Sequence, residues 1–330
     1  MYYNNKLDTL RDIFSDKEAA FRDGFFFAGG GKYPVIEDVI ILCGVSEYTD
    51  FVKNRLAGTG NAGDSATIAR DIQSTFGEEW KSYSKILPEH EKEFLQYFDI
   101  TPPASLSGKR CCDLGCGMGR WSYFLSQYAK EIILVDFSDA IFVARENLRG
   151  KDNCLFFMGD IKNLPFRPDF ADFIFSLGVL HHLPTPCLEE VRKLKYSAPE
   201  LLIFLYYALD NRPLHFRMIL KAVTFVRSIV WRVKNPLFRK IFSLCGTYLV
   251  YMPLIIFGKI LKPFGLSQLA PLYDFYKDKS PQRIEQDVYD RFFTRIEQRV
   301  TRKEILQLGD TFRAVEVSNN LPFWHFRCKR

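Results

Sequence analysis

A glycine-rich loop that directly follows an apolar run is the feature that most constrains this sequence. Residues 110–121 read Arg-Cys-Cys-Asp-Leu-Gly-Cys-Gly-Met-Gly-Arg-Trp, and residues 121–128 continue with helical spacing of apolar side chains. Gly115, Gly117 and Gly119 allow a sharp turn and a close approach of the backbone to a ligand, near the positive end of that helix. The segment therefore predicts a strand, a ligand-binding loop and a helix, in this order.

An acidic residue ends the next apolar run, Ile132-Ile-Leu-Val-Asp136. In dinucleotide-binding folds, a carboxylate at this place accepts hydrogen bonds from ribose hydroxyls. We therefore expect Asp136 to bind the ribose of a nucleotide-like cofactor. The alternative for this residue is a cap on the helix that begins after Ser138.

Apolar runs alternate with amphipathic stretches through the middle of the chain. The runs end at Cys112, Val135, Met158, Ser176 and Tyr206, and residues 121–128, 139–148 and 188–194 have helical spacing between them. Such a series predicts an α/β fold with a parallel, doubly wound sheet and right-handed crossovers. Two final strands, over residues 312–318 and 322–328, are predicted to pair antiparallel.

The chain divides into four parts. Residues 1–70 are a small N-terminal extension with a linker, residues 71–210 the ligand-binding core, residues 211–265 a basic, apolar helical insert, and residues 266–330 the C-terminal part of the sheet. The extension is predicted to contain a helix over residues 1–20, two short strands around a glycine turn over 24–42, and a small-residue linker over 56–66. Further helices are expected over residues 76–84, 89–98 and 282–308.

The loop from Asp113 to Gly119 resembles the cofactor signature of the class I S-adenosylmethionine-dependent methyltransferases, and it differs from the loop of nicotinamide enzymes. Met158–Ile161 and Asp172–Pro184 resemble later segments of the same family, and the Leu-His-His-Leu sequence in the second is typical of its small-molecule branch. The resemblance extends over residues 76–210, and the sequence after the fifth strand is similar to a subset of uncharacterised bacterial members. It implies a Rossmann-like, seven-stranded methyltransferase sheet with a helical insert before the last strands.

This resemblance implies that the chain binds S-adenosylmethionine. Asp160 would contact the adenine, Asp136 the ribose, and Asp113 would hold the loop near the amino-acid end of the cofactor. The residues implied in cofactor binding are Asp113, Gly115, Gly117, Gly119, Asp136, Phe137, Asp160, Ile161 and Leu177. The alternative is a plain strand–helix turn at the glycines and a cap at Asp160.

His181 and His182 follow the fourth strand, at the sheet edge where open α/β folds bind ligands. Either is a candidate catalytic base if the acceptor is a hydroxyl group, and the alternative is a histidine that packs against or orients the loop. The residues expected to contact the substrate are Trp80, Tyr83, Tyr206 and Arg299. For the aromatic residues at helical spacing, a place in the core is the competing interpretation.

No metal site is expected, because the eight cysteines include no Cys-x-x-Cys pair and no histidine lies at zinc-finger spacing. Residues 31–42 faintly resemble a zinc-ribbon-like module that is fused to some methyltransferases. Its metal cysteines are missing here, which implies a metal-free remnant. The first residues contain no apolar signal segment, so we expect a cytoplasmic protein.

Charge is distributed unevenly along the chain. Residues 211–330 contain 22 Lys and Arg against 9 Asp and Glu, whereas the whole chain has a net charge of only +6. Ten basic and no acidic residues lie between Asn211 and Tyr273, and Ile241–Gly258 holds 18 uncharged residues in a row. This length is at the lower limit of a membrane span, about 17–25 residues. The insert is therefore interpreted as a helix that lies on an anionic membrane or as a soluble lid, and less well as a span.

We expect an enzyme that transfers a methyl group from S-adenosylmethionine to a small molecule, which is lipid-like or a saccharide. Its location would be cytoplasmic, with peripheral contact to the inner face of the membrane through residues 211–265. Two alternatives stay open: an RNA methyltransferase, which the basic C-terminal half would tolerate, and a non-catalytic scaffold that binds the cofactor. Nucleic acid is the less favoured partner, because no RNA-binding module is visible.

Overall fold

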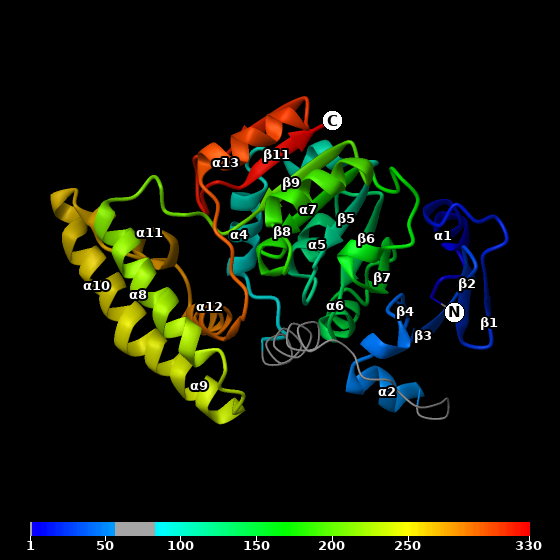
Figure 1. Cartoon of the computed structure of the whole chain (residues 1–330), viewed down its shortest axis with the longest axis horizontal. Helices are drawn as coiled ribbons and strands as arrows, with labels where there is room; N and C mark the ends of the chain where they lie inside the picture. The colour runs from blue at the N-terminus through cyan, green and yellow to red at the C-terminus, as the bar shows by residue number, and fades with distance from the viewer. Residues whose placement is uncertain (1, 57–82) are drawn as a thin grey trace.

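The computed structural model describes residues 2–56 and 83–330. Eleven strands of this part form one sheet, and helices cover both of its faces (Figure 1). The strands are β1 (Ala20–Arg22), β2 (Phe25–Ala28), β3 (Gly31–Ile36), β4 (Val39–Ile41), β5 (Arg110–Leu114), β6 (Glu131–Asp136), β7 (Cys154–Met158), β8 (Phe173–Leu177), β9 (Glu200–Phe204), β10 (Ala314–Val317) and β11 (Phe326–Lys329). Their order across the sheet is β1-β2-β3-β4-β7-β6-β5-β8-β9-β11-β10.

The central strands have the predicted doubly wound arrangement. β7, β6, β5, β8 and β9 run parallel, and β11 pairs antiparallel with both β9 and β10. Because the chain moves outward from β5 to β6 and β7 and then returns to β8, the strand order reverses beside β5. Ligands bind in such sheets at this reversal, outside the carboxyl ends of the strands. The predicted α/β fold class and its seven-stranded methyltransferase sheet are confirmed, and the glycine loop follows β5.

Helices cover the sheet in two layers. One face packs on α4 (Glu89–Tyr97), α5 (Arg120–Leu125) and α6 (Ala140–Asn147), and the other on α1 (Leu7–Ile13), α7 (Cys187–Lys193) and α13 (Arg302–Leu306). Each central strand supplies both cores, because successive side chains of a strand point to opposite faces. Cys111 of β5, for example, lies in one core and Cys112 in the other.

The N-terminal extension differs from the prediction. Its helix is only α1, because the chain turns at Ser15 and enters β1 at Ala20. The predicted pair of strands is a set of three, β2 to β4, and β4 pairs in parallel with β7. The Tyr3 hydroxyl donates to the Asp38 carbonyl (2.6 Å) and accepts from the Phe156 amide (3.2 Å). The extension therefore continues the main sheet. Helix α2 (Asp50–Leu56) follows it. Nearly all of the predicted linker lies outside the described residues.

The insert folds into helices that stand beside the carboxyl ends of the strands (Figure 1). They are α8 (Leu214–Val230), α9 (Pro236–Cys245), a π-helical stretch η6 (Gly246–Tyr251), α10 (Met252–Leu261) and α11 (Tyr273–Tyr276). Helix α12 (Pro281–Phe293) packs against α8, α9 and η6. The predicted single helix over 282–308 is wrong. Helix α12 ends at Phe293, the backbone is extended at Thr294, and helical structure resumes only at α13.

One continuous helical segment of the described residues, Pro236–Phe264, is long and apolar enough to cross a membrane by length and composition alone. Its most apolar window has a mean hydropathy of 1.8, and only 28% of that window is buried inside the protein. A core helix of a soluble protein would be mostly buried. This segment instead presents most of its apolar surface outward.

Candidate functional site

The glycine loop has the backbone that its sequence predicts. Gly115, Gly117 and Gly119 have φ angles of +77°, +52° and +76°, which side chains other than hydrogen rarely allow. A Cβ atom on Gly115 would lie 2.4 Å from Val179, and one on Gly119 would lie 2.7 Å from Leu148. The loop is therefore shaped by the absence of side chains. Gly115 and Gly117 line a cavity at the carboxyl edge of the sheet, whereas Gly119 packs against α6 and does not.

Asp136 closes one side of this cavity. Its Oδ2 accepts a hydrogen bond from the Gly117 amide (2.8 Å), and its Oδ1 accepts from the amide (2.9 Å) and hydroxyl (2.7 Å) of Ser138. Burial raises the pKa of this carboxyl above its usual value, and the hydrogen bonds from Ser138 and Gly117 act in the opposite direction. A carboxylate accepts about four hydrogen bonds, so room for a ribose hydroxyl is left. Asp136 both orders the loop and lines the cavity.

The cavity has a volume of about 1110 Å³ and extends from the glycine loop to the helical insert. Of the residues implied in cofactor binding, it is lined by Gly115, Gly117, Asp136, Phe137, Asp160, Ile161 and Leu177. Asp160 also caps the turn that follows β7, since its Oδ1 accepts from the Lys162 amide at 3.0 Å. Glycines without a Cβ, a carboxylate and apolar side chains at one end of a cavity fit the ribose, adenine and methionine parts of S-adenosylmethionine.

Asp113 does not belong to this lining. It is 1% exposed, and its Oδ2 accepts a hydrogen bond from the Ser122 hydroxyl of α5 at 2.7 Å. Burial raises its pKa to about 7, and the Ser122 hydrogen bond acts against this rise. Asp113 therefore ties β5 to α5 beneath the loop. Neither Asp113 nor Gly119 is among the described residues that line the cavity, and the contact of both with the cofactor stays a prediction.

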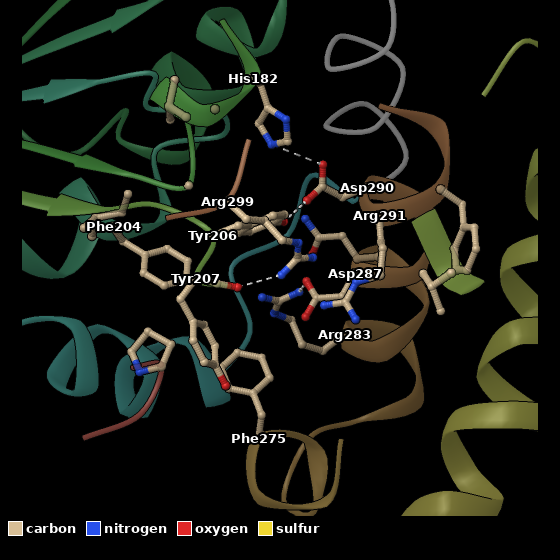
Figure 2. A pocket seen from close by; sticks show the side chains of 18 of the residues that line it. His182, Phe204, Tyr206, Tyr207, Phe275, Arg283, Asp287, Asp290, Arg291 and Arg299 are labelled. Carbon is tan, nitrogen blue, oxygen red and sulfur yellow. Dashed lines mark hydrogen bonds and ion pairs between the residues drawn. The ribbon is translucent and has the colours of Figure 1, made fainter. Parts of the chain in front are cut away.

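The two histidines occupy different surroundings. His181 is fully buried, its ring lies 3.9 Å from the Tyr206 ring, and burial holds its pKa well below the usual value. His182 lines the cavity, and its Nδ1 lies 2.7 Å from the Ile296 carbonyl oxygen. Because a carbonyl only accepts, Nδ1 carries the proton and Nε2 of the neutral ring is the basic nitrogen. Nε2 lies 4.0 Å from Oδ1 of Asp290 (Figure 2).

Helix α12 supplies a charged wall to the same cavity (Figure 2). The residues of α12 that line it are Arg283, Gln286, Asp287, Asp290, Arg291 and Phe292. Tyr206 donates its hydroxyl hydrogen to Asp290, and Arg299 donates to the carbonyl of Tyr207 (3.0 Å) and to Glu297 (2.7 Å). Both Tyr206 and Arg299 line the cavity, and their contact with a substrate stays a prediction.

One predicted substrate residue, Tyr83, lies elsewhere. Tyr83 is buried against Tyr289 and Phe293 of α12, and its hydroxyl bonds to Glu285 at 3.1 Å. It is not among the described residues that line the cavity and lies in a small core, which favours the competing interpretation, and its contact with the substrate stays a prediction. Trp80 lies outside the described residues.

The far end of the cavity is apolar and belongs to the insert. Phe216, Leu220, Val223, Phe242 and Leu254 line it together with neighbouring side chains. Ile219, Val226, Leu249 and Val250 line the cavity and are also exposed, by 40% to 72%. The cavity therefore opens among exposed apolar side chains of α8 and η6.

From the sequence, residues 282–300 were expected to build the acceptor pocket together with the insert, but Arg299 was the only residue of this segment named for substrate contact. Arg283, Asp287, Asp290 and Arg291 recur at intervals of three and four residues, so they share one face of the helix. Ile284, Val288 and Phe293 on the same helix are buried. The sequence does show that α12 has a charged face and an apolar face. This pattern is the same whether the charged face lines a cavity or faces solvent, so it could not identify the cavity wall.

The comparison with protein families gives one match. Residues 111–195 match the family model described as "Methyltransferase domain". Among curated proteins, phosphoethanolamine N-methyltransferase 3 of Arabidopsis thaliana is 31% identical over 139 residues, which is 38% of this chain and 27% of that protein. A tRNA U34 carboxymethyltransferase of Campylobacter curvus is 28% identical over 108 residues, 32% of this chain and 36% of that protein. The chain thus spans about a quarter to a third of the length of these relatives.

Two solved structures are similar to part of the chain at lower identity. A phosphoethanolamine N-methyltransferase of Haemonchus contortus, in complex with phosphoethanolamine and S-adenosylhomocysteine, has 18% identity and a TM-score of 0.35 over 42% of this chain and 33% of that chain. A SAM-dependent methyltransferase of Aquifex aeolicus has 20% identity and a TM-score of 0.31 over 36% of this chain and 72% of that chain. The family match confirms the predicted methyltransferase resemblance over residues 111–195.

Proposed function

We propose that this chain, whose residues 111–195 match a methyltransferase domain, transfers the methyl group of S-adenosylmethionine to a hydroxyl group of an amphiphilic small molecule. One observation carries the proposal. A single cavity joins the glycine loop and Asp136 at one end to the apolar helices of the insert at the other, with His182 in its lining. A cofactor and an apolar acceptor can therefore lie in one space.

Alignment is the main task of the protein in this reaction. Bound S-adenosylmethionine supplies a methyl group that its positive sulfur has already activated. Gly115, Gly117 and Asp136 bind the cofactor at a fixed place, and Tyr206 and α12 limit the directions from which an acceptor can approach. In the best model systems, correct positioning lowers a barrier by roughly 7–11 kcal/mol.

His182 is the residue that would take the acceptor proton. Its Nδ1–H is engaged by the Ile296 carbonyl, so its Nε2, which is buried in this structure, would accept the proton from a hydroxyl group that reaches it from the cavity. The resulting imidazolium would lie 4.0 Å from the Asp290 carboxylate, which stabilises a positive charge. Asp290 keeps its position through Tyr206 and Thr294.

The insert supports a peripheral place at the inner, anionic face of a membrane. Of 24 exposed large apolar residues in the described part of the chain, 18 lie between Leu214 and Leu269. The basic residues Arg217, Lys221, Lys259 and Lys262 are exposed on the same helices, and no acidic residue stands between 211 and 273. Apolar side chains with basic neighbours suit an anionic bilayer surface. An acceptor with an apolar chain would then enter through the mouth at Leu249 and Val250.

An RNA acceptor is the second candidate, because the two curated relatives have different acceptors in their names. One is named for phosphoethanolamine and the other for a tRNA nucleotide. The basic C-terminal half is compatible with RNA. Retention on RNA that weakens steeply with salt would favour this candidate. A non-catalytic scaffold is the third, and it would bind cofactor without turnover on any extract.

Incubation with methyl-labelled S-adenosylmethionine and cell extract tests these alternatives together. After separation into lipid, RNA, protein and small soluble fractions, we expect the label in the lipid fraction. Label in RNA would replace the proposal by the second candidate. Absence of label from every fraction, with cofactor binding intact, would support the scaffold.

A further inference from the structure

Most charged residues at the α12 end of the cavity have a partner of opposite charge. Arg283 donates to both carboxylate oxygens of Glu93 (3.1 and 3.2 Å) and also bonds to Asp287. Lys279 donates to Glu93 at 2.8 Å. These two cations and two carboxylates form one buried network of balanced charge.

Two further arginines in the lining are also paired. Arg212 donates to Asp274 at 3.0 Å, and Arg299 donates to Glu297 at 2.7 Å. Each pair again has no net charge. The guanidinium groups of these residues still carry N–H donors beyond those used in the pair, since arginine has five.

Arg291 is different. It lines the cavity, and within the described residues no Asp or Glu oxygen lies within 4.0 Å of its guanidinium. Its Nε is buried and has no hydrogen-bond partner in that part of the chain. Arginine stays charged at any physiological pH, and a charge out of water is costly unless an opposite charge compensates it. Among the carboxylates of the described residues, Glu297 acts on Arg291 only at longer range, and it already accepts a hydrogen bond from Arg299. The position therefore favours an anionic ligand.

The carboxylate next to it in sequence does not supply that charge. Asp290 instead accepts hydrogen bonds from Tyr206 and Thr294 and faces His182. Asp287 is held by Arg283 and by the Tyr276 hydroxyl (2.9 Å). Arg291 thus stands between carboxylates that are already engaged, with the cavity on its open side (Figure 2).

We propose that Arg291, with Arg299 beside it, binds an anionic head group of the acceptor, and that the apolar part of the acceptor lies along α8 and η6. This inference rests on the proposed function and adds the substrate class: an amphiphile with a phosphate or carboxylate group near the reacting hydroxyl. The planar guanidinium forms paired hydrogen bonds with such oxyanions. Apolar side chains from Phe216 to Val226 and from Phe242 to Leu254 would contact the chain of the acceptor.

Calorimetric titration with three probes tests the subsite: decyl phosphate, decanol and inorganic phosphate. The proteins are the wild type, Arg291→Gln and Arg291→Lys, with Arg217→Gln as a matched control on an exposed arginine of the insert. We expect Arg291→Gln to weaken decyl phosphate binding at least ~10-fold, the range of one charge-assisted hydrogen bond. Arg291→Lys should weaken it less, because it retains the charge but loses the paired geometry.

Decanol should bind all four proteins equally, and inorganic phosphate should bind the wild type far more weakly than decyl phosphate. Equal affinity of wild type and Arg291→Gln for decyl phosphate would overturn the inference, and so would equal affinity of the wild type for decyl phosphate and decanol. Affinity for S-adenosylmethionine, measured on the same samples, reports folding and separates the two proposals. Arg291-dependent binding of decyl phosphate without any cofactor binding would refute the proposed function and leave the anionic subsite standing.

Discussion

His181 and His182 are neighbours in sequence, yet only one of them faces the cavity. The Leu180–His182 turn directs the first ring onto Tyr206 inside the protein and the second toward Asp290. No sequence pattern distinguishes these directions, because the turn geometry and the packing of β9 decide them. The distinction predicts different consequences for two otherwise identical substitutions.

His182→Gln should lower the rate of methyl transfer by ~10²-fold or more, since glutamine cannot take the acceptor proton. His181→Gln should lower the free energy of unfolding and leave the rate per folded molecule within a few-fold of the wild type, because it breaks only packing. Label transfer into the acceptor fraction and thermal unfolding, measured for both variants, check this. A loss of transfer in His181→Gln alone, or near-normal rates in both, would contradict the assignment of the base.

Asp113 predicts a dependence of stability on pH. Its pKa in the folded protein is about 7, above the ordinary value of 3.8 that it regains on unfolding. Below pH 4 the carboxyl is protonated in both states and its contribution to stability is complete. As pH rises toward 7 the unfolded chain ionises first, so the free energy of unfolding falls by up to about 1.4 kcal/mol per unit from this group.

Asp113→Asn removes this titration and retains a hydrogen-bond acceptor for Ser122. Its free energy of unfolding should therefore fall less between pH 4 and 7 than that of the wild type. Urea unfolding at several pH values measures the free energy of unfolding of both proteins. The titration of all other groups cancels in the difference between the two values. Parallel stability curves would show that Asp113 is not the buried acid described above.

Among the elements, the core strands were predictable and the flanking ones less so. The five parallel strands end within two residues of the predicted positions, because fully buried strands are continuous apolar runs with sharp ends. The strands β1 to β3 are short and partly exposed, so the number of strands in the extension was underestimated. The pairing of β4 with β7 depends on contacts between residues more than a hundred positions apart, which local patterns do not encode.

The insert predicts binding to anionic membranes, but the charges that matter differ from those that the sequence suggests. The run Arg232, Lys234, Arg239 and Lys240 is the densest basic stretch of the insert. However, Arg239 is 4% exposed and donates to Tyr289, and Lys240 pairs with Glu285. Reversing these two charges would disturb the packing of α9 on α12 and would confuse unfolding with loss of membrane contact.

Charge reversal to Glu at Arg217, Lys221, Lys259 and Lys262 avoids this difficulty, because all four are exposed. Each basic residue near an anionic surface is worth ~1 kcal/mol, so the variant should lose most of its co-sedimentation with anionic vesicles. A control with reversals at the exposed residues Lys17, Arg22, Lys130 and Arg149, outside the insert, should still sediment. If the wild-type protein stays in the supernatant with anionic vesicles at low salt, the insert does not bind membranes and is a soluble lid.

At the scale of the whole molecule, the cavity is assembled from three distant parts of the chain. The glycine loop and β6 supply one end, α12 and Arg299 the middle, and α8 to α10 the other end. The first part was predictable because its residues form a compact motif with fixed spacing. The second and third parts were predictable only as segments, because residues 282–300 and the insert were expected to build the acceptor pocket. Only tertiary packing decides that the charged face of α12 lines the cavity.

Binding of S-adenosylmethionine is the measurement that tests the central claim most directly. Titration calorimetry should give a micromolar dissociation constant for the wild type, and Asp136→Ala should weaken it by ~1–3 kcal/mol through loss of a buried hydrogen-bond acceptor. Asp152→Ala, an exposed acid of the core outside the cavity lining, should bind as the wild type does. Equal affinities of the wild type and Asp136→Ala, or tighter binding of a nicotinamide cofactor than of S-adenosylmethionine, would contradict the account.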